Sequence, residues 1–302
     1  MTVVCCWLDN SYGRSRITSI ADARISSQLP NGNWVKVSDN TTKLFSISIR
    51  CHSANSFDAD TSRLTNPYFQ TDICIGFSGY CTEAFSIISL FQRAVSQLAS
   101  EDEDNPKPEA RGLLVYFSEI AKKYLHGHTN ASTQRVEFLL FGFDAINNNP
   151  WVGRVAYDPS INSCSTDFRS PIDENDIYWI GDKSVVEILD DSVRKTRSQI
   201  LRHKNALKLG DGDDAFFEYQ KSTAQHDSAD KKIIEQRVLD AIHNKFLETV
   251  GGAIQKMEIY GKEDHAAVAS HCSEIGVDFF DGLPSISNFN LFFLKVCERM
   301  GR

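Results

Sequence analysis

The chain begins Met1-Thr2-Val3-Val4-Cys5-Cys6-Trp7-Leu8, a threonine followed at once by a short apolar run typical of a strand. Removal of Met1 would leave a hydroxyl and a free α-amine on the same residue, Thr2. A hydroxyl attacks poorly unless a neighbouring group takes its proton, and an α-amine, with an ordinary pKa of about 7.7–8.0, can do so near neutral pH. Thr2 is therefore a candidate nucleophile with its own base. The ordinary alternative is that Thr2 only starts a domain.

Two further strands are expected after this run, and they carry an acid and a base. Residues 17–24 read as a strand that a polar turn at 10–16 folds back on the first one, which brings Asp22 near Thr2. A third strand, Lys-Leu-Phe-Ser-Ile-Ser-Ile, alternates with period two and begins at Lys43. We expect the ammonium of Lys43 to meet the carboxylate of Asp22 beside the threonine.

Short motifs follow one another along most of residues 2–260. They are Met1-Thr2 before the apolar strand, Ala21-Asp22-Ala23-Arg24, Thr42-Lys43-Leu44 and Ile75-Gly76-Phe77-Ser78-Gly79-Tyr80-Cys81-Thr82-Glu83-Ala84-Phe85, with weaker counterparts at Phe141-Gly142-Phe143-Asp144, Trp179-Ile180-Gly181 and Val250-Gly251-Gly252. In their order and spacing they resemble the N-terminal-nucleophile (Ntn) hydrolases of the proteasome β-subunit type, which include the HslV-type peptidase. The resemblance implies an α+β fold.

The resemblance also implies a role for each matching residue. The hydroxyl oxygen of Thr2 would attack an amide carbonyl while its amine carries the proton. Lys43 would lower the pKa of that pair, Asp22 would fix Lys43, and the backbone N–H of Gly79 would bind the oxyanion. Arg24, in the same motif as Asp22, is a supporting candidate.

Two positions depart from the family pattern. Where the family usually has a serine that orients the amine, this chain has Asp182, and before the glycine pair Leu247 and Val250 replace an aspartate and a serine. A carboxylate at Asp182 would raise the pKa of a nearby amine, yet it could still hold the amine in place as a supporting residue. Equally, Asp182 is a preferred N-cap for a helix beginning at Lys183. The two roles are not exclusive.

The remaining elements are predicted from apolar periodicity and turn residues. Helices are expected at 84–98, 112–126, 184–207, 230–250 and 266–275, and strands at 137–144, 151–158 and 177–180. Stacked as helix, sheet, sheet, helix, they form a four-layer αββα sandwich of two antiparallel sheets flanked by helices.

The domain organisation follows from where the motifs stop. Residues 1–260 are expected to form one Ntn-hydrolase domain, with insertions at about 51–72 and 208–232. Residues 261–302 are expected to form a helical extension packed on that domain, because they contain a strongly apolar run that must be buried.

Composition narrows the class of function. The 302 residues carry a formal charge of −8 and no basic cluster, which argues against a nucleic-acid surface. No apolar run is long enough to span a membrane and no secretion signal is visible, so we expect a cytoplasmic protein.

The eight cysteines form no Cys-x-x-Cys pair, and the acidic run at 209–214 lacks a complete calcium loop. We expect neither a metal nor a cofactor.

Three functions fit these observations. The first is a proteasome-like threonine peptidase or amidase that acts on peptides or proteins and assembles with copies of itself. The second is a non-catalytic subunit of the same fold that serves in assembly or binding. The third is a small-molecule amidase of the wider Ntn class. No Walker-type phosphate loop is present, so any ATPase that feeds the enzyme must be a separate protein.

Overall fold

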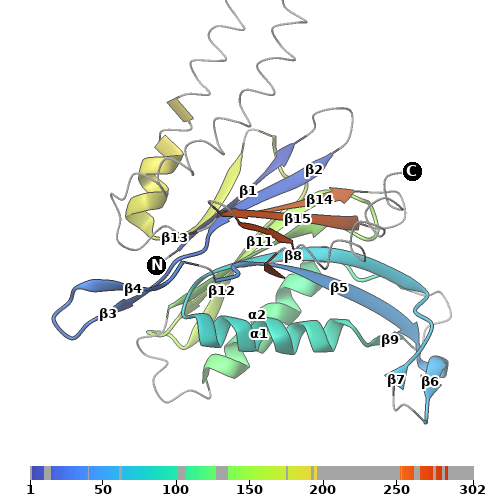
Figure 1. Cartoon of the computed structure of the whole chain (residues 1–302). Helices are drawn as coiled ribbons and strands as arrows, with labels where there is room; N and C mark the ends of the chain where they lie inside the picture. Colours follow the sequence, from blue (N-terminus) through green and yellow to red (C-terminus); the bar gives the residue numbers. More distant parts are fainter. Residues whose placement is uncertain are drawn as a thin grey trace, which may run out of the picture.

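A computed structural model of the chain describes residues 2–9, 15–39, 41–60, 63–100, 106–126, 135–174, 176–191, 194–195, 252 and 254–261, and the backbone of 266–274, 277–280 and 283–284. Two sheets lie face to face, and two helices cover the outer face of one of them (Figure 1). The chain is therefore α+β, as predicted.

The first sheet carries the start of the chain. Its neighbouring strands are antiparallel, and their order is β13 (Ile177–Gly181), β1 (Val3–Asp9), β2 (Arg16–Asp22), β14 (Ile254–Gly261), β15 (Ala266–Glu274), β16 (Val277–Phe280) and β17 (Leu283–Pro284). The register Val4↔Ala21 shows that β1 and β2 form the predicted hairpin. This pairing places the end of β2 beside the start of β1.

The second sheet lies below the first in Figure 1 and is mixed. Its order is β12 (Ser163–Arg169), β11 (Pro150–Asp158), β10 (Val136–Phe143), β8 (Phe69–Gly79), β5 (Leu44–Ser53) and β9 (Leu98–Ser100). The prediction of purely antiparallel sheets is wrong at the edge, where β9 pairs with β5 in parallel. The chain reaches that edge from β8 through a helix, and β9 then runs opposite to β8 and therefore parallel to β5.

The predicted helices after β8 are confirmed as α1 (Cys81–Val95) and α2 (Ala110–His126). Their apolar faces pack on the second sheet, where Phe91 and Phe117 meet Phe138 in a fully buried cluster. A second cluster fills the space between the sheets, with Val4 and Met257 from one sheet against Phe141 from the other. Among the helices that the structure describes, none is long and apolar enough to cross a membrane.

The outer face of the first sheet is covered by a helix at residues 183–191, which packs Val185 and Leu189 on Val3 and Trp7. The rest of the helix expected at 184–207, the helix expected at 230–250 and the insertion expected at 208–232 lie outside the described residues. The complete four-layer sandwich therefore stays a prediction.

The insertion expected at 51–72 is smaller than predicted. Strands β5 and β8 stay paired as far as Cys51↔Phe69, so the connection is only 54–68. It holds a 3-10 turn (Ala54–Ser56) and a small hairpin of β6 (Phe57–Asp58) and β7 (Arg63–Leu64). The polar residues His52 and Thr71 led to the longer predicted insertion, but in the structure they are buried within the strands β5 and β8.

The helix expected at 266–275 is wrong, because residues 266–274 form β15. That strand pairs with β14 from Ile254↔Ser273 to Gly261↔Ala266. The alanines of this segment favour a helix locally, but the unpaired backbone groups at the edge of β14 favour a strand. The described part of the tail expected to be helical is therefore sheet, and residues 285–302 lie outside the described residues.

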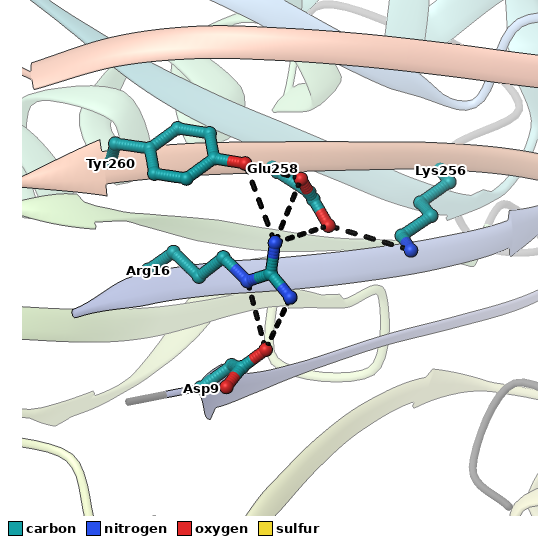
Figure 2. Close-up of polar contacts among 5 residues, drawn as sticks. All are labelled: Asp9, Arg16, Lys256, Glu258 and Tyr260. Atoms are coloured by element: carbon teal, nitrogen blue, oxygen red, sulfur yellow. Dashed lines mark hydrogen bonds and ion pairs between the residues drawn. The ribbon is translucent and has the colours of Figure 1, made fainter. Parts of the chain in front are cut away.

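A polar network joins β1, β2 and β14 at the ends of these strands that lie farthest from the start of the chain (Figure 2). Arg16 donates to Asp9 Oδ2 from Nε at 2.8 Å and Nη2 at 2.7 Å, and to Glu258 from Nη1 at 3.3 Å. Glu258 also accepts from the hydroxyl of Tyr260 at 2.5 Å and lies 3.4 Å from Lys256 Nζ. Since Asp9 is buried, this pairing offsets the cost of its desolvated charge.

Candidate active site

Thr2 and Lys43 are in contact at the end of the two sheets where β1 and β5 start. Thr2 directly precedes β1 of the first sheet, and Lys43 directly precedes β5 of the second. The Nζ atom of Lys43 donates a hydrogen bond to Oγ1 of Thr2. Both residues are 1% exposed, so the contact is shielded from water. A hydrogen bond from a cation to a hydroxyl stabilises the deprotonated form of that hydroxyl.

Asp22 completes the group from the end of β2. Its carboxylate accepts a hydrogen bond from the backbone N–H of Val3 at 2.9 Å, and the residue is fully buried. The negative charge of Asp22 also acts on Lys43, where it favours the ammonium form. The β1–β2 hairpin therefore places the carboxylate of Asp22 on the backbone of Val3, next to Thr2.

The environment of Lys43 opposes its charge. Burial lowers the pKa of Lys43, and the negative charge of Asp22, together with that of the Cys81 thiolate at high pH, only partly compensates. Its Nζ atom lies 5.1 Å from the centre of the Phe77 ring, a contact that favours a cation. A lysine in such surroundings exchanges its proton more readily than an exposed one, which suits a group that tunes a nucleophile.

Gly79 ends β8 next to this group, and its backbone requires glycine. Its φ of +109° is a conformation that side chains rarely adopt, and a Cβ there would lie 2.0 Å from the carbonyl oxygen of Arg135. The adjacent Ser78 donates from Oγ to the carbonyl oxygen of Thr2 at 3.3 Å. Ser78 was not among the site residues predicted from the sequence, although it lies in the motif that contains Gly79.

Asp182 contacts Thr2 through its backbone rather than through its side chain. Its N–H donates to the carbonyl oxygen of Thr2 at 3.1 Å. Its carboxylate accepts from the N–H of Ser184 at 3.1 Å and from the hydroxyl of Ser184 at 2.7 Å, which caps the helix at 183–191. Of the two roles that the sequence left open, these contacts favour the cap.

Arg24 stands apart from the other candidates. Its Nε pairs with Asp39 at 2.7 Å, at the foot of the hairpin formed by β3 (Ile25–Gln28) and β4 (Trp34–Ser38). This hairpin projects from the body of the protein, and in the sequence it lies between Asp22, at the end of β2, and Lys43, just before β5 (Figure 1). Arg24 thus anchors a hairpin in the connection between two site residues.

Gln255 of β14 is a second site residue that was not predicted from the sequence. Its buried side chain accepts from the backbone N–H of Lys43 at 2.6 Å and donates to the carbonyl oxygen of Thr41 at 2.6 Å. The signal is a polar residue at an inward position of a strand whose next inward residues are Met257 and Ile259. Leu247 and Val250, the other departures from the family pattern, lie outside the described residues.

Comparisons with known proteins found similar solved structures but no matching family model or curated sequence. No protein-family model and no curated protein sequence matches the chain. Among solved structures, Anbu (ancestral beta-subunit) from Yersinia bercovieri is similar at 10% identity and a TM-score of 0.43, over 89% of this chain and 86% of that one. Eukaryotic HslV from Trypanosoma brucei is similar at 13% identity and a TM-score of 0.37, over 89% of this chain and 98% of that one. Because both TM-scores lie below 0.5, a function for this chain must be inferred from the contacts of its own residues.

Proposed function

We propose that this chain is a threonine hydrolase that cleaves amide bonds in peptides or proteins, with Thr2 as its N-terminal nucleophile. The observation that supports this most is the hydrogen bond from Lys43 to the hydroxyl of Thr2, with Asp22 on the neighbouring backbone N–H. A buried ammonium is costly and adds little to the stability of a strand. It is useful next to a hydroxyl that must be activated.

The reaction would proceed in two halves. After Met1 is removed, Oγ1 of Thr2 attacks the substrate carbonyl carbon while the free α-amine of Thr2 takes the hydroxyl proton. Lys43 lowers the pKa of the hydroxyl, and the N–H of Gly79 stabilises the negative oxygen of the tetrahedral intermediate. The carbon–nitrogen bond then breaks as the amine gives its proton to the leaving nitrogen, which leaves an ester on Thr2. Water, deprotonated by the same amine, attacks this ester, and the acid product leaves as the Thr2 hydroxyl re-forms.

Removal of Met1 is essential to this mechanism. While Met1 is attached, the nitrogen of Thr2 is a peptide amide, whose lone pair is delocalised and cannot act as a base. With Met1 attached, Thr2 is also only 1% exposed. Processing therefore creates the base and takes away a residue bonded directly to the nucleophile.

A non-catalytic member of the same fold, acting in assembly or binding, is the second candidate. Asp182 favours it, because its carboxylate caps a helix at the position where the resembled family has a serine that orients the amine. The burial of Thr2 favours it as well. This candidate predicts that the protein does not react even after Met1 has been removed.

The proposal extends to the assembly and the surroundings of the enzyme. We propose a cytoplasmic protein with a complete four-layer αββα sandwich that associates with copies of itself in a ring or helical assembly. Any ATP-driven unfolding of substrates would come from a separate ATPase, because this sequence has no Walker-type loop.

The test combines intact mass with active-site labelling. Purified protein is incubated with a peptide β-lactone, an electrophile that acylates activated hydroxyls, and the adduct is located by peptide mapping. The proposal predicts loss of one methionine, one adduct on Thr2, and no adduct in Thr2→Ala. A processed, folded protein that forms no adduct with such probes and cleaves no peptide would favour the non-catalytic candidate.

A further inference from the structure

Gln255 links the two sheets at the candidate site. It lies on β14 of the first sheet, opposite Ala21 and therefore one register position from the Asp22↔Ile254 pair. Its side chain reaches the first residues of β5 in the second sheet, although 212 positions separate Gln255 from Lys43. The residue is 6% exposed, so these contacts are made away from water.

Within the described residues, the hydrogen bonds of the Gln255 carboxamide are all to the main chain around Lys43. Its oxygen accepts from the N–H groups of Lys43 at 2.6 Å and Leu44 at 3.2 Å. Its nitrogen donates to the carbonyl oxygen of Thr41 at 2.6 Å. Only this orientation matches donors with acceptors, since N–H groups require the oxygen and a carbonyl requires the NH₂.

These bonds hold a segment that the second sheet holds on one side only. The pairing of β5 with β8 begins at Leu44↔Gly76, one residue after Lys43. The carbonyl of Lys43 accepts from the N–H of Phe77 at 3.2 Å, while its own N–H is bound by Gln255. The main chain of Lys43 is thus fixed on both sides, and one side depends on Gln255.

We propose that Gln255 is a positioning residue for the chemistry of Thr2: by fixing the main chain of residues 41–44, it places the ammonium of Lys43 on the Thr2 hydroxyl. The effect on reactivity rests on the function proposed above. The effect on Lys43 does not, because the placement of the ammonium is independent of whether Thr2 reacts.

A loosened main chain at Lys43 changes the proton affinity of this lysine. The groups that face Lys43 are Asp22 on β2, Cys81 at the start of α1 and the hydroxyl of Thr2. Burial lowers the pKa of Lys43, while the charge of Asp22 and, at high pH, that of the Cys81 thiolate raise it. Gln255 carries no charge, so its loss acts by admitting water to the ammonium, and the pKa of Lys43 should rise towards its ordinary value.

Three variants separate this role from a general loss of stability. Gln255→Met keeps the length of the side chain but removes the three hydrogen bonds. Gln255→Glu keeps an oxygen that accepts from Lys43 and Leu44 and loses the donor to Thr41. Gln97→Met is the matched control, because the Gln97 oxygen also accepts a backbone N–H, that of Leu64 at 3.0 Å, in an exposed position at the edge of the second sheet.

The experiment measures two quantities in folded, Met1-processed protein. The first is labelling of Thr2 by the peptide β-lactone, divided into the maximal rate kinact and the half-saturating concentration KI. The second is the pKa of Lys43 by NMR of protein labelled at lysine Cε, with the signal assigned from Lys43→Arg. We expect Gln255→Met to lower kinact by about tenfold or more, as a displaced catalytic group does, to leave KI unchanged and to raise the pKa of Lys43. Gln255→Glu should retain more of kinact, and Gln97→Met should match the wild type.

The outcomes distinguish the positioning role from the proposed function. If the wild type labels and Gln255→Met, shown to be folded by its melting curve, keeps the same kinact and the same pKa of Lys43, the positioning role is wrong. If Gln255→Met does not fold, the kinact of Gln255→Glu decides, because its own charge would raise the pKa of Lys43: a kinact below that of Gln97→Met supports the role, and the wild-type value overturns it. If the wild type does not label, the proposed function fails. The pKa of Lys43 then decides the positioning role: a rise in Gln255→Met supports it, and an unchanged value overturns it.

Discussion

The side chain of Lys43 donates a hydrogen bond to the hydroxyl of Thr2 across the junction of two sheets, although the residues are 41 positions apart. The contact does not come from strand pairing, because β1 and β5 belong to different sheets and share no backbone hydrogen bonds. The contact forms because the two sheets pack face to face, and β1 and β5 both start at the same end of this pair of sheets. Asp22, which ends β2, reaches that end because β2 is antiparallel to β1.

Replacing Lys43 should strongly reduce the reactivity of Thr2 and leave the fold intact. Lys43→Met keeps the length and apolar body of the side chain but removes the cation that lowers the pKa of the hydroxyl. We expect the rate of Thr2 labelling to fall by about 100-fold or more, within the range for loss of a proton-transfer or charge-stabilising group. Circular dichroism should report the wild-type secondary structure. Wild-type labelling in this variant would show that Lys43 has no part in activation.

The stability of the protein should depend on pH through Lys43. Because burial lowers the pKa of Lys43 below its ordinary value of 10.5, the folded state binds fewer protons than the unfolded chain between those two pKa values. The contribution of Lys43 to the free energy of unfolding therefore rises with pH across that interval and is constant below it.

Urea denaturation of wild type and Lys43→Met at several values from about pH 7 to about pH 10 measures this contribution. The free energy of unfolding of the wild type minus that of the variant should increase with pH. Taking this difference cancels the opposite effect of the buried thiols, such as Cys5, whose pKa burial raises to about 12. A difference that stays constant would mean that Lys43 keeps its ordinary pKa in the folded protein, and a difference that falls would mean that its pKa is raised.

Gly79 and Gly112 should respond in opposite directions to the same substitution. Gly79→Ala places a Cβ 2.0 Å from the carbonyl oxygen of Arg135 at a φ of +109°, so backbone must move, and we expect a loss of about 2 kcal/mol or more. Gly112 lies within α2 and has open space around its missing Cβ. Gly112→Ala should therefore stabilise by about 0.5–1 kcal/mol. Thermal and urea denaturation of both variants would check this contrast, which a similar effect at both sites would contradict.

The network around Arg16 should stabilise the sheet without affecting the reactivity of Thr2. Asp9→Asn weakens the buried pairing with Arg16, and we expect a loss of about 1–3 kcal/mol. Asp167→Asn is the control, because Asp167 pairs with Arg169 at 3.5 Å with both side chains 63% exposed, and such pairs contribute about 0–1 kcal/mol. Urea denaturation measures the two losses. Equal losses, or a change in Thr2 labelling in Asp9→Asn, would count against this assignment.

The sequence predicted the elements whose pattern is local. The β1–β2 hairpin and helices α1 and α2 lie close to their expected bounds, because their alternation and their apolar stripes depend on neighbours along the chain. The same pattern placed Thr2, Asp22 and Lys43 at the ends of strands that meet. Their roles in catalysis remain a prediction.

The elements that were missed depend on distant partners. The segment at 266–274 became a strand because the edge of β14 offered backbone partners, which its alanines could not indicate. Gln255 contacts Lys43 from 212 positions away, and no local pattern encodes such a contact. The carboxylate of Asp182 could be read as a cap or as a support for the amine, and only its contacts with Ser184 favour the cap.

The most direct test of the central claim is the reaction of the processed protein with a peptide epoxyketone, followed by a crystal structure of the adduct. An epoxyketone can bond to a hydroxyl through its ketone and to an adjacent amine through its epoxide, so it reports both groups of an N-terminal threonine. The account predicts a ring that joins the reagent to Oγ1 and the α-nitrogen of Thr2, with Lys43 beside the modified oxygen. Protein that has lost Met1 but forms no such adduct, or that is modified elsewhere, would contradict it.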